Sequence, residues 1–197
     1  MLTTPLLAPL GTLDSSARST QLADASALLF DRLGPLHGLR FRDCELLRRS
    51  AVGVAFIHAM GSYSTLEHEL FELALADLPA ADALVVETAV CLAVDRVALH
   101  SGEPRVTSTD EQRRILWLAA MLRFAEAIAG ERGILVDDVY AAWTEDVLYI
   151  EIDGAISCDE TLKRPRSRSA ALEAVSGRRL VLTSSARRRE AARTPAA

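Results

Sequence analysis

The strongest helical signal in the chain is STDEQRRILWLAAMLRFAEAIAG, residues 108–130. Ser108 or Thr109 can cap its start, acidic residues follow at positions 110 and 111, and Gly130 supplies a stop. Apolar side chains recur at intervals of three and four, which places them on one helical face. They are Ile115, Leu118, Leu122, Ala125 and Ala129. The segment predicts a long helix with one buried side.

Four further helices are predicted before this segment. Residues 19–33 have one apolar face, and Gly34-Pro35 should end that helix. The next begins near Asp43, a plausible N-cap, and ends at Gly61. Its buried stripe comprises Leu46, Leu47, Ser50, Val54 and Ile57. Residues 65–77 form the third helix, and residues 81–99 form the fourth, which is apolar on more than one side and is therefore expected at the centre of a bundle.

After Gly133 the apolar period changes from 3.6 residues to 2. Residues 136–143 and 147–152 are predicted strands of a hairpin, followed by a helix over 167–175, a stop at Gly177 and a strand over 179–183. We therefore expect a mainly α fold, in which a helical bundle precedes a small α/β extension of hairpin, helix and strand. The predicted parts are an N-terminal extension (1–18), a helical domain (19–133), the α/β extension (134–184) and a disordered basic tail (185–197).

Charge is distributed unevenly along the 197 residues, whose net charge is −5. Residues 161–197 contain ten basic and two acidic residues, whereas residues 1–160 contain 12 basic and 25 acidic ones. Because nucleic acids are bound by clustered basic charge, the acidic body argues against nucleic acid as the main partner. The basic end remains a candidate for binding an anion.

The sequence lacks the signals of export or membrane insertion. Residues 1–13 have no basic start and contain two prolines, unlike a secretory signal. The longest apolar stretch, 83–94, is interrupted by Glu87 and is too short to span a bilayer. The three cysteines are far apart and lack CxxC spacing. We expect a cytoplasmic protein with reduced thiols and no membrane association.

The order of the segments resembles the C-terminal half of the exopolyphosphatase and guanosine-pentaphosphate phosphohydrolase (Ppx/GppA) family. The resemblance covers roughly residues 19–183 and consists in segment order and apolar spacing. The segments are LLRRSAVGVAFIHAMG (46–61), LEHELFELALADLP (66–79), ALVVETAVCLAVDRVALHSGEP (83–104), RRILWLAAMLRFAEAIAG (113–130) and AALEAVSGRRLVL (170–182). It implies an HD-domain-like helical bundle with a short α/β extension. The family's catalytic domains precede this half, and the chain shows none of their glycine loops.

The HD metal site that the resemblance implies is degenerate in this sequence. The early histidine of the family falls near Gln21, and the histidine of the His-Asp pair is His58, followed by Ala59 in place of the aspartate. His68 is retained, the family's His-Arg pair reads Asp95-Arg96, and the late aspartate is Glu126. His58, His68, Asp95 and Glu126 remain as a candidate set for one divalent metal ion, such as Mn, Mg or Zn.

Each member of this set also has a structural interpretation. His58 follows Val54 by one helical turn and fits a hydrogen-bonded core position. His68 fits a partly exposed helix position, and Asp95 fits a structural ion pair or an exposed helix end. Glu126 fits an ion pair with Arg123 or another arginine. His37 lies near a helix end, where an imidazolium would favour the helix dipole.

The candidate anion-binding residues lie in the basic part of the sequence. They are Lys163, Arg164, Arg166 and Arg168. Arginine forks suit an extended polyanion such as polyphosphate, or guanosine tetraphosphate or pentaphosphate. For Arg187–Arg189 the alternative is a solubilising tail.

These observations give three hypotheses for function. The first is a stand-alone, non-catalytic binding or regulatory module for polyphosphate or a phosphate-rich nucleotide, which by analogy with the family self-associates as a homodimer. The second is a metal-dependent HD-type phosphohydrolase that uses the four candidate metal ligands. The third is a scaffold that pairs with a separate catalytic subunit.

Overall fold

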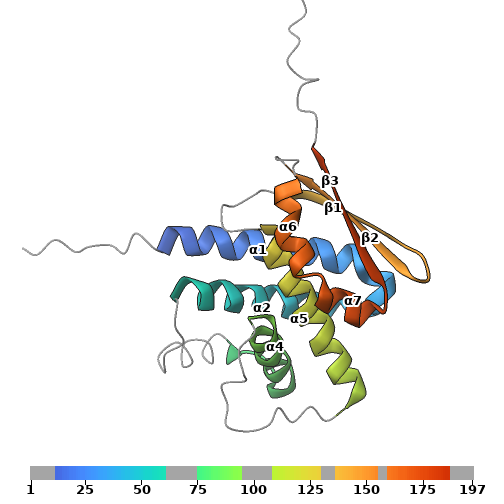
Figure 1. Ribbon diagram of the computed structural model, residues 1–197. Coiled ribbons are helices and arrows are strands. Elements are labelled where there is room, and N and C mark those ends of the chain that lie inside the picture. The colour runs from blue at the N-terminus through green and yellow to red at the C-terminus, as the bar shows by residue number, and fades with distance from the viewer. Residues whose placement is uncertain (1–11, 61–74, 95–107, 130–135, 155–158, 187–197) are drawn as a thin grey trace, which may run out of the picture.

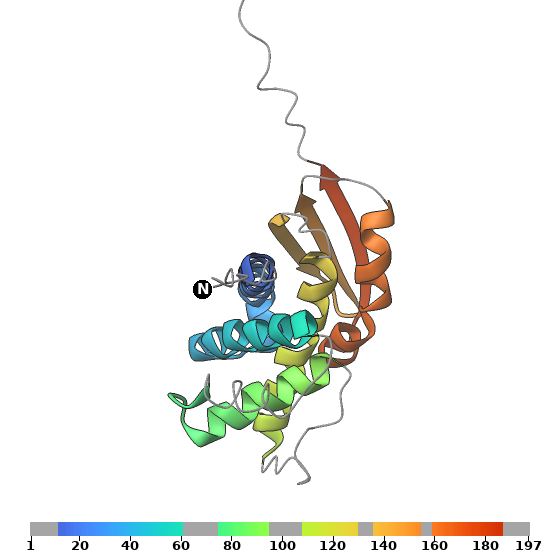
Figure 2. The ribbon, with the colours of Figure 1, turned by 90° about the vertical axis from the view of Figure 1, so that its left-hand side faces the viewer.

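The long helix predicted over residues 108–129 lies at the centre of the fold. The computed structural model describes residues 12–60, 75–94, 108–129, 136–154 and 159–186. Helix α5 (Thr109–Ala129) contacts the other five described helices directly and lies between the layer of α1, α2 and α4 and the layer of α6, α7 and the sheet (Figure 2). From Trp117 to Ala129 every side chain except Arg123 is buried. Its five predicted stripe residues are all buried, as expected.

Helices α1 (Thr12–His37) and α2 (Phe41–Met60) form an antiparallel pair (Figure 1). Helix α1 begins within the predicted N-terminal extension. The expected stop at Gly34-Pro35 is wrong, because the helix continues for three more residues. Gly34 has no Cβ to clash with the proline ring, so the position before Pro35 can stay helical. The helix ends at Gly38, which has a φ of 62°.

Asp43 stabilises the start of α2 from inside the helix rather than as its N-cap. The predicted cap was three residues too late, because Arg40 holds that position and its backbone N–H donates to Asp43 Oδ2 at 2.9 Å. This is the acidic half of a capping box. The predicted stripe of α2 is buried throughout, and its members are 0–5 % exposed.

Helix α4 (Ala80–Ala93) lies at the edge of the helical layer and not at its centre (Figure 1). It packs on α2 and α5 through Val85, Val86 and Val90, while Leu92 is 42 % exposed. The sequence prediction of a central helix here was therefore wrong. Other apolar side chains of α4, such as Leu84 and Leu92, are only partly buried. Most of the predicted helix 65–77 and the end of 81–99 lie outside the described residues.

The C-terminal part forms a three-stranded sheet in the order β1-β2-β3. Strands β1 (Val136–Trp143) and β2 (Val147–Gly154) are the predicted hairpin, while β3 (Arg179–Ala186) pairs parallel to β2. One face of the sheet is buried against the helices through its alternating apolar residues. These include Val139, Leu148, Ile150, Ile152 and Leu182. Strand β3 extends two residues into the predicted tail.

Two short helices connect the parallel strands. Helix α7 (Ala170–Ser176) is the predicted helix, and it ends at Gly177, whose φ is 66°. Helix α6 (Asp159–Ser167) lies where the sequence analysis predicted neither a helix nor a strand, apart from its last residue. Its buried side chains, Leu162 and Pro165, lie three residues apart and so face the core together. The predicted class, a mainly helical bundle with a small α/β extension, is confirmed.

Candidate functional site

Glu126 is a buried carboxylate near the C-terminal end of α5. It follows Leu122 by one turn and is only 6 % exposed, although it carries a charge. A charged group at this depth is costly unless it is paired and hydrogen-bonded. The residues around Glu126 therefore determine whether this position is tolerated and what it can do.

Two side chains from other helices meet the same oxygen of Glu126. His58 Nε2, from the last turn of α2, lies 3.1 Å from Glu126 Oε1. Arg164 Nη2, from α6, donates to that oxygen at 3.0 Å. Each of these two side chains is 34 % exposed, so the buried carboxylate connects to the surface through its partners. The core position predicted for His58 was wrong, whereas the arginine pair predicted for Glu126 is present.

The surroundings keep Glu126 ionised. Burial raises the pKa of the Glu126 carboxyl, but the hydrogen bond from His58 and the charges of His58, Arg164 and Arg168 together lower it below its ordinary value. A carboxyl with a lowered pKa is fully charged at neutral pH. Glu126 therefore contributes one full negative charge to the site.

Three arginines act electrostatically at Glu126. Burial lowers the pKa of Arg123, the charge of Arg168 lowers it further, and the charge of Glu126 opposes both. Glu126, His58, Arg123, Arg164 and Arg168 thus form one electrostatic group, called here the Glu126 cluster. Among its described members there are three guanidinium groups and one carboxylate. Clustered guanidinium groups are typical of sites that bind anions.

The structure brings together two of the four predicted metal ligands. His58 and Glu126 are in contact, whereas His68 and Asp95 lie outside the described residues. Two donors are fewer than a divalent ion needs, and Arg164 already shares the carboxylate oxygen. Among the described residues, no group of three or more His, Cys, Asp or Glu side chains is placed to hold a metal ion. The four-residue metal set therefore stays a prediction, because two of its members lie outside the described residues.

Two of the four predicted anion-binding residues belong to the same cluster. Arg164 and Arg168 interact with Glu126, and Lys163 and Arg166 are exposed on α6. The sequence interpretation treated the metal set and the anion set as separate sites. Their convergence was missed because no helix was predicted at the position of α6. Arg123, three residues before Glu126 on α5, was the available signal, since that spacing places both on one helical face.

No protein-family model and no curated protein matches this chain. None of the helices in the described ranges has the length and apolar character needed to cross a membrane.

Proposed function

We propose that this protein is a non-catalytic binding module for polyphosphate or a phosphate-rich nucleotide, and that the ligand binds at the Glu126 cluster. The observation that carries this proposal is the meeting of His58 and Arg164 on one oxygen of a buried carboxylate. The charges of Arg123 and Arg168 act on the same group, so three guanidinium groups gather at one carboxylate.

The chemistry of the cluster supports a phosphate-bearing ligand. A guanidinium has five N–H donors, and Arg164 uses one described bond to reach Glu126. The planar fork of an arginine is well suited to paired hydrogen bonds with phosphate oxygens. Lys163 and Arg166 on the exposed side of α6 would extend such contacts along a chain of phosphates.

The alternative is a metal-dependent HD-type phosphohydrolase, which the contact between His58 and Glu126 favours. The electrostatics of the cluster oppose this hypothesis, because the guanidinium of Arg164, 3.0 Å from Glu126 Oε1, would repel a divalent cation at that oxygen.

The resemblance to the Ppx/GppA family also suggests a cytoplasmic homodimer. The third hypothesis is a scaffold that pairs with a separate catalytic subunit and binds neither a phosphate-rich ligand nor a metal ion.

The test is a titration of the full chain with polyphosphate and with guanosine tetraphosphate, repeated on Arg168→Gln. We expect Arg168→Gln to weaken binding by about tenfold, because one charge-assisted contact is lost. Arg179→Gln removes the same charge from an exposed position on β3 and serves as the matched control. Equal weakening in both variants, or no binding to the wild-type protein, would contradict the proposed site.

A thermal-shift series with Mn²⁺, Mg²⁺ and Zn²⁺ separates the binding module from the hydrolase. The hydrolase requires that a metal stabilises the wild-type protein and that His58→Ala removes this stabilisation. The binding module requires that polyphosphate stabilises the protein without added metal. A protein that responds to none of these compounds would favour the scaffold.

A further inference from the structure

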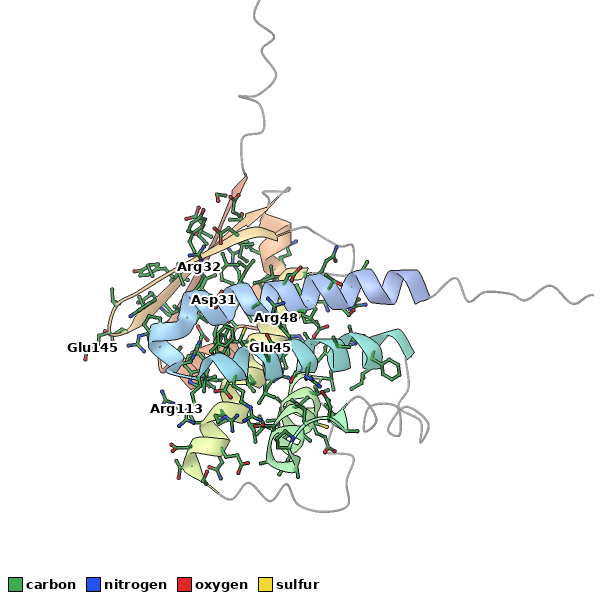
Figure 3. The ribbon with its side chains drawn as sticks, turned by 180° about the vertical axis from the view of Figure 1, so that it is seen from behind. Asp31, Arg32, Glu45, Arg48, Arg113 and Glu145 are labelled. Atoms are coloured by element: carbon green, nitrogen blue, oxygen red, sulfur yellow. The ribbon has the colours of Figure 1, made fainter. Side chains whose placement is uncertain are left out.

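A second polar site lies away from the Glu126 cluster, at the other end of α5. It is a cavity of about 550 Å³ between the end of α1 and the first turns of α2, α4 and α5. This volume is within the usual range for small-molecule sites. Arg113 lies here beside the turn between α1 and α2 (Figure 3), and its Nη2 donates to the backbone carbonyl of His37 at 3.0 Å.

The wall of the cavity is a closed set of ion pairs. Asp43 and Asp82 are buried, at 2 % and 6 % exposed. Arg114 donates to Asp43 Oδ1 through Nε at 2.9 Å and through Nη2 at 2.6 Å, and it reaches Asp82 Oδ1 at 3.4 Å. Arg42 pairs with the other oxygen of Asp82. Two carboxylates and two guanidinium groups therefore balance one another, and the wall has no net charge.

Two further side chains that line the cavity offer free charges of opposite sign. Arg40 and Asp110 are both exposed, and neither side chain makes a hydrogen bond or an ion pair with any described residue. Arg113 and Glu111 add one more positive and one more negative group to the lining. In total the lining contains four arginines and four acidic residues.

The charge balance selects the chemistry of the ligand. A simple anion would be attracted by Arg40 and Arg113 but repelled by Asp110 and Glu111. A simple cation would be attracted by the two acidic residues and repelled by the two arginines. A molecule with both an ammonium and a carboxylate satisfies both kinds of group at once. We propose that this cavity binds a small zwitterion of the amino-acid type, with its carboxylate toward Arg40 and Arg113 and its ammonium toward Asp110.

On the α1–α2 side, hydrogen bonds within the protein fix the conformation of the cavity rim without a ligand. His37 is 1 % exposed and bridges two backbone groups: Nε2 donates to the Phe30 carbonyl, and Nδ1 accepts from the Leu39 N–H, both at 2.8 Å. Gly38 makes the left-handed turn between the helices. A fixed rim lowers the entropic cost of binding, because less of the protein has to be ordered.

The experiment is a titration of the full chain with glycine, L-alanine, L-leucine and L-lysine, followed by thermal shift and calorimetry. Acetate and methylammonium at the same concentrations test each charge alone. We expect at least one amino acid to raise the melting temperature while neither single-charge ion does. Arg40→Gln and Asp110→Asn should each weaken that binding by about tenfold or more. Arg179→Gln and Asp24→Asn, at exposed positions outside the cavity, should leave it unchanged.

Three results would overturn the proposal. They are the absence of a response to all four amino acids, an equal response to acetate, and wild-type affinity in the Arg40 and Asp110 variants. Both of these side chains are exposed, so the variants are expected to fold, and far-UV circular dichroism checks this. Polyphosphate binding at the Glu126 cluster should be the same in both variants, so the two proposals fail or succeed separately.

Discussion

At the scale of single residues, Glu126 has opposite roles in the two leading functions. For a phosphate ligand its negative charge is a competitor, since it occupies Arg164 and repels the anion. For a metal ion its carboxylate would be an essential ligand. The substitution Glu126→Gln removes the charge and keeps an oxygen that can accept the hydrogen bond from Arg164.

We predict that Glu126→Gln binds polyphosphate about tenfold more tightly than the wild-type protein, because a nearby repulsive charge is removed. Without ligand, the variant should be less stable by about 1–3 kcal/mol, because basic groups lose their charged partner. Titration calorimetry measures the first effect and chemical denaturation the second. Glu151→Gln, exposed on β2, is the control. Weaker polyphosphate binding in the Glu126 variant would be inconsistent with the cluster as the phosphate site.

At the scale of helices and strands, most of the fold could be predicted where one segment has one apolar face. Helix α5 and the β1–β2 hairpin were found because their periods of 3.6 and 2 residues are regular over many residues. Helix α6 was missed because its sequence, DETLKRPRS, has only Leu162 and Pro165 to bury and contains a proline. Its helical form depends on packing against α5 and β3, which no local pattern reveals.

The corner between α1 and α2 has a histidine in a role that the sequence did not predict. An imidazolium at the helix end was expected at His37, but burial lowers the pKa of this imidazole, which outweighs the opposing effects of the Phe30 carbonyl and of Asp43. The two hydrogen bonds of the His37 ring are consistent with a lowered pKa. Nδ1 accepts a hydrogen bond from the Leu39 backbone N–H, so it cannot carry a proton of its own without losing that bond.

We predict that this corner loses stability as the pH falls below about 6.5, the ordinary pKa of histidine. Because the folded pKa is below the unfolded pKa, the unfolded chain binds a proton first, and acid favours unfolding. Above that pH both states have a neutral imidazole and the effect vanishes. Thermal melts between pH 7.5 and 5 should show a smaller pH dependence for His37→Gln than for the wild-type protein. Parallel curves would show that His37 does not titrate in this way.

At the scale of the whole molecule, the charge division in the sequence does not become a division in space. Helix α6, which begins the basic part, packs directly on α5 of the acidic part. Each half of the Glu126 cluster was visible in the sequence, as a metal set and as an anion set. Their meeting could not be predicted, because it needs the packing of α2, α5 and α6 around one carboxylate.

The two proposed sites lie near opposite ends of α5. Asp110 and Glu126 are 16 residues apart on this helix, which corresponds to about 24 Å at 1.5 Å per residue. Groups this far apart with no shared partner usually contribute independently to stability. A ligand at one hundred times its Kd stabilises the folded state by about 2.7 kcal/mol.

We therefore predict that an amino-acid ligand and polyphosphate, each at about one hundred times its Kd, together raise the free energy of unfolding by about 5.4 kcal/mol. Chemical denaturation with each ligand alone and with both measures the increments. Arg40→Gln should lower only the amino-acid increment, and Arg168→Gln only the polyphosphate increment, each to about 1.4 kcal/mol if binding is tenfold weaker. A combined increment no larger than that of one ligand would mean that the two compounds compete for a single site. An increment that exceeds the sum would mean that α5 couples the sites, since a ligand that orders one end of the helix then lowers the cost of binding at the other.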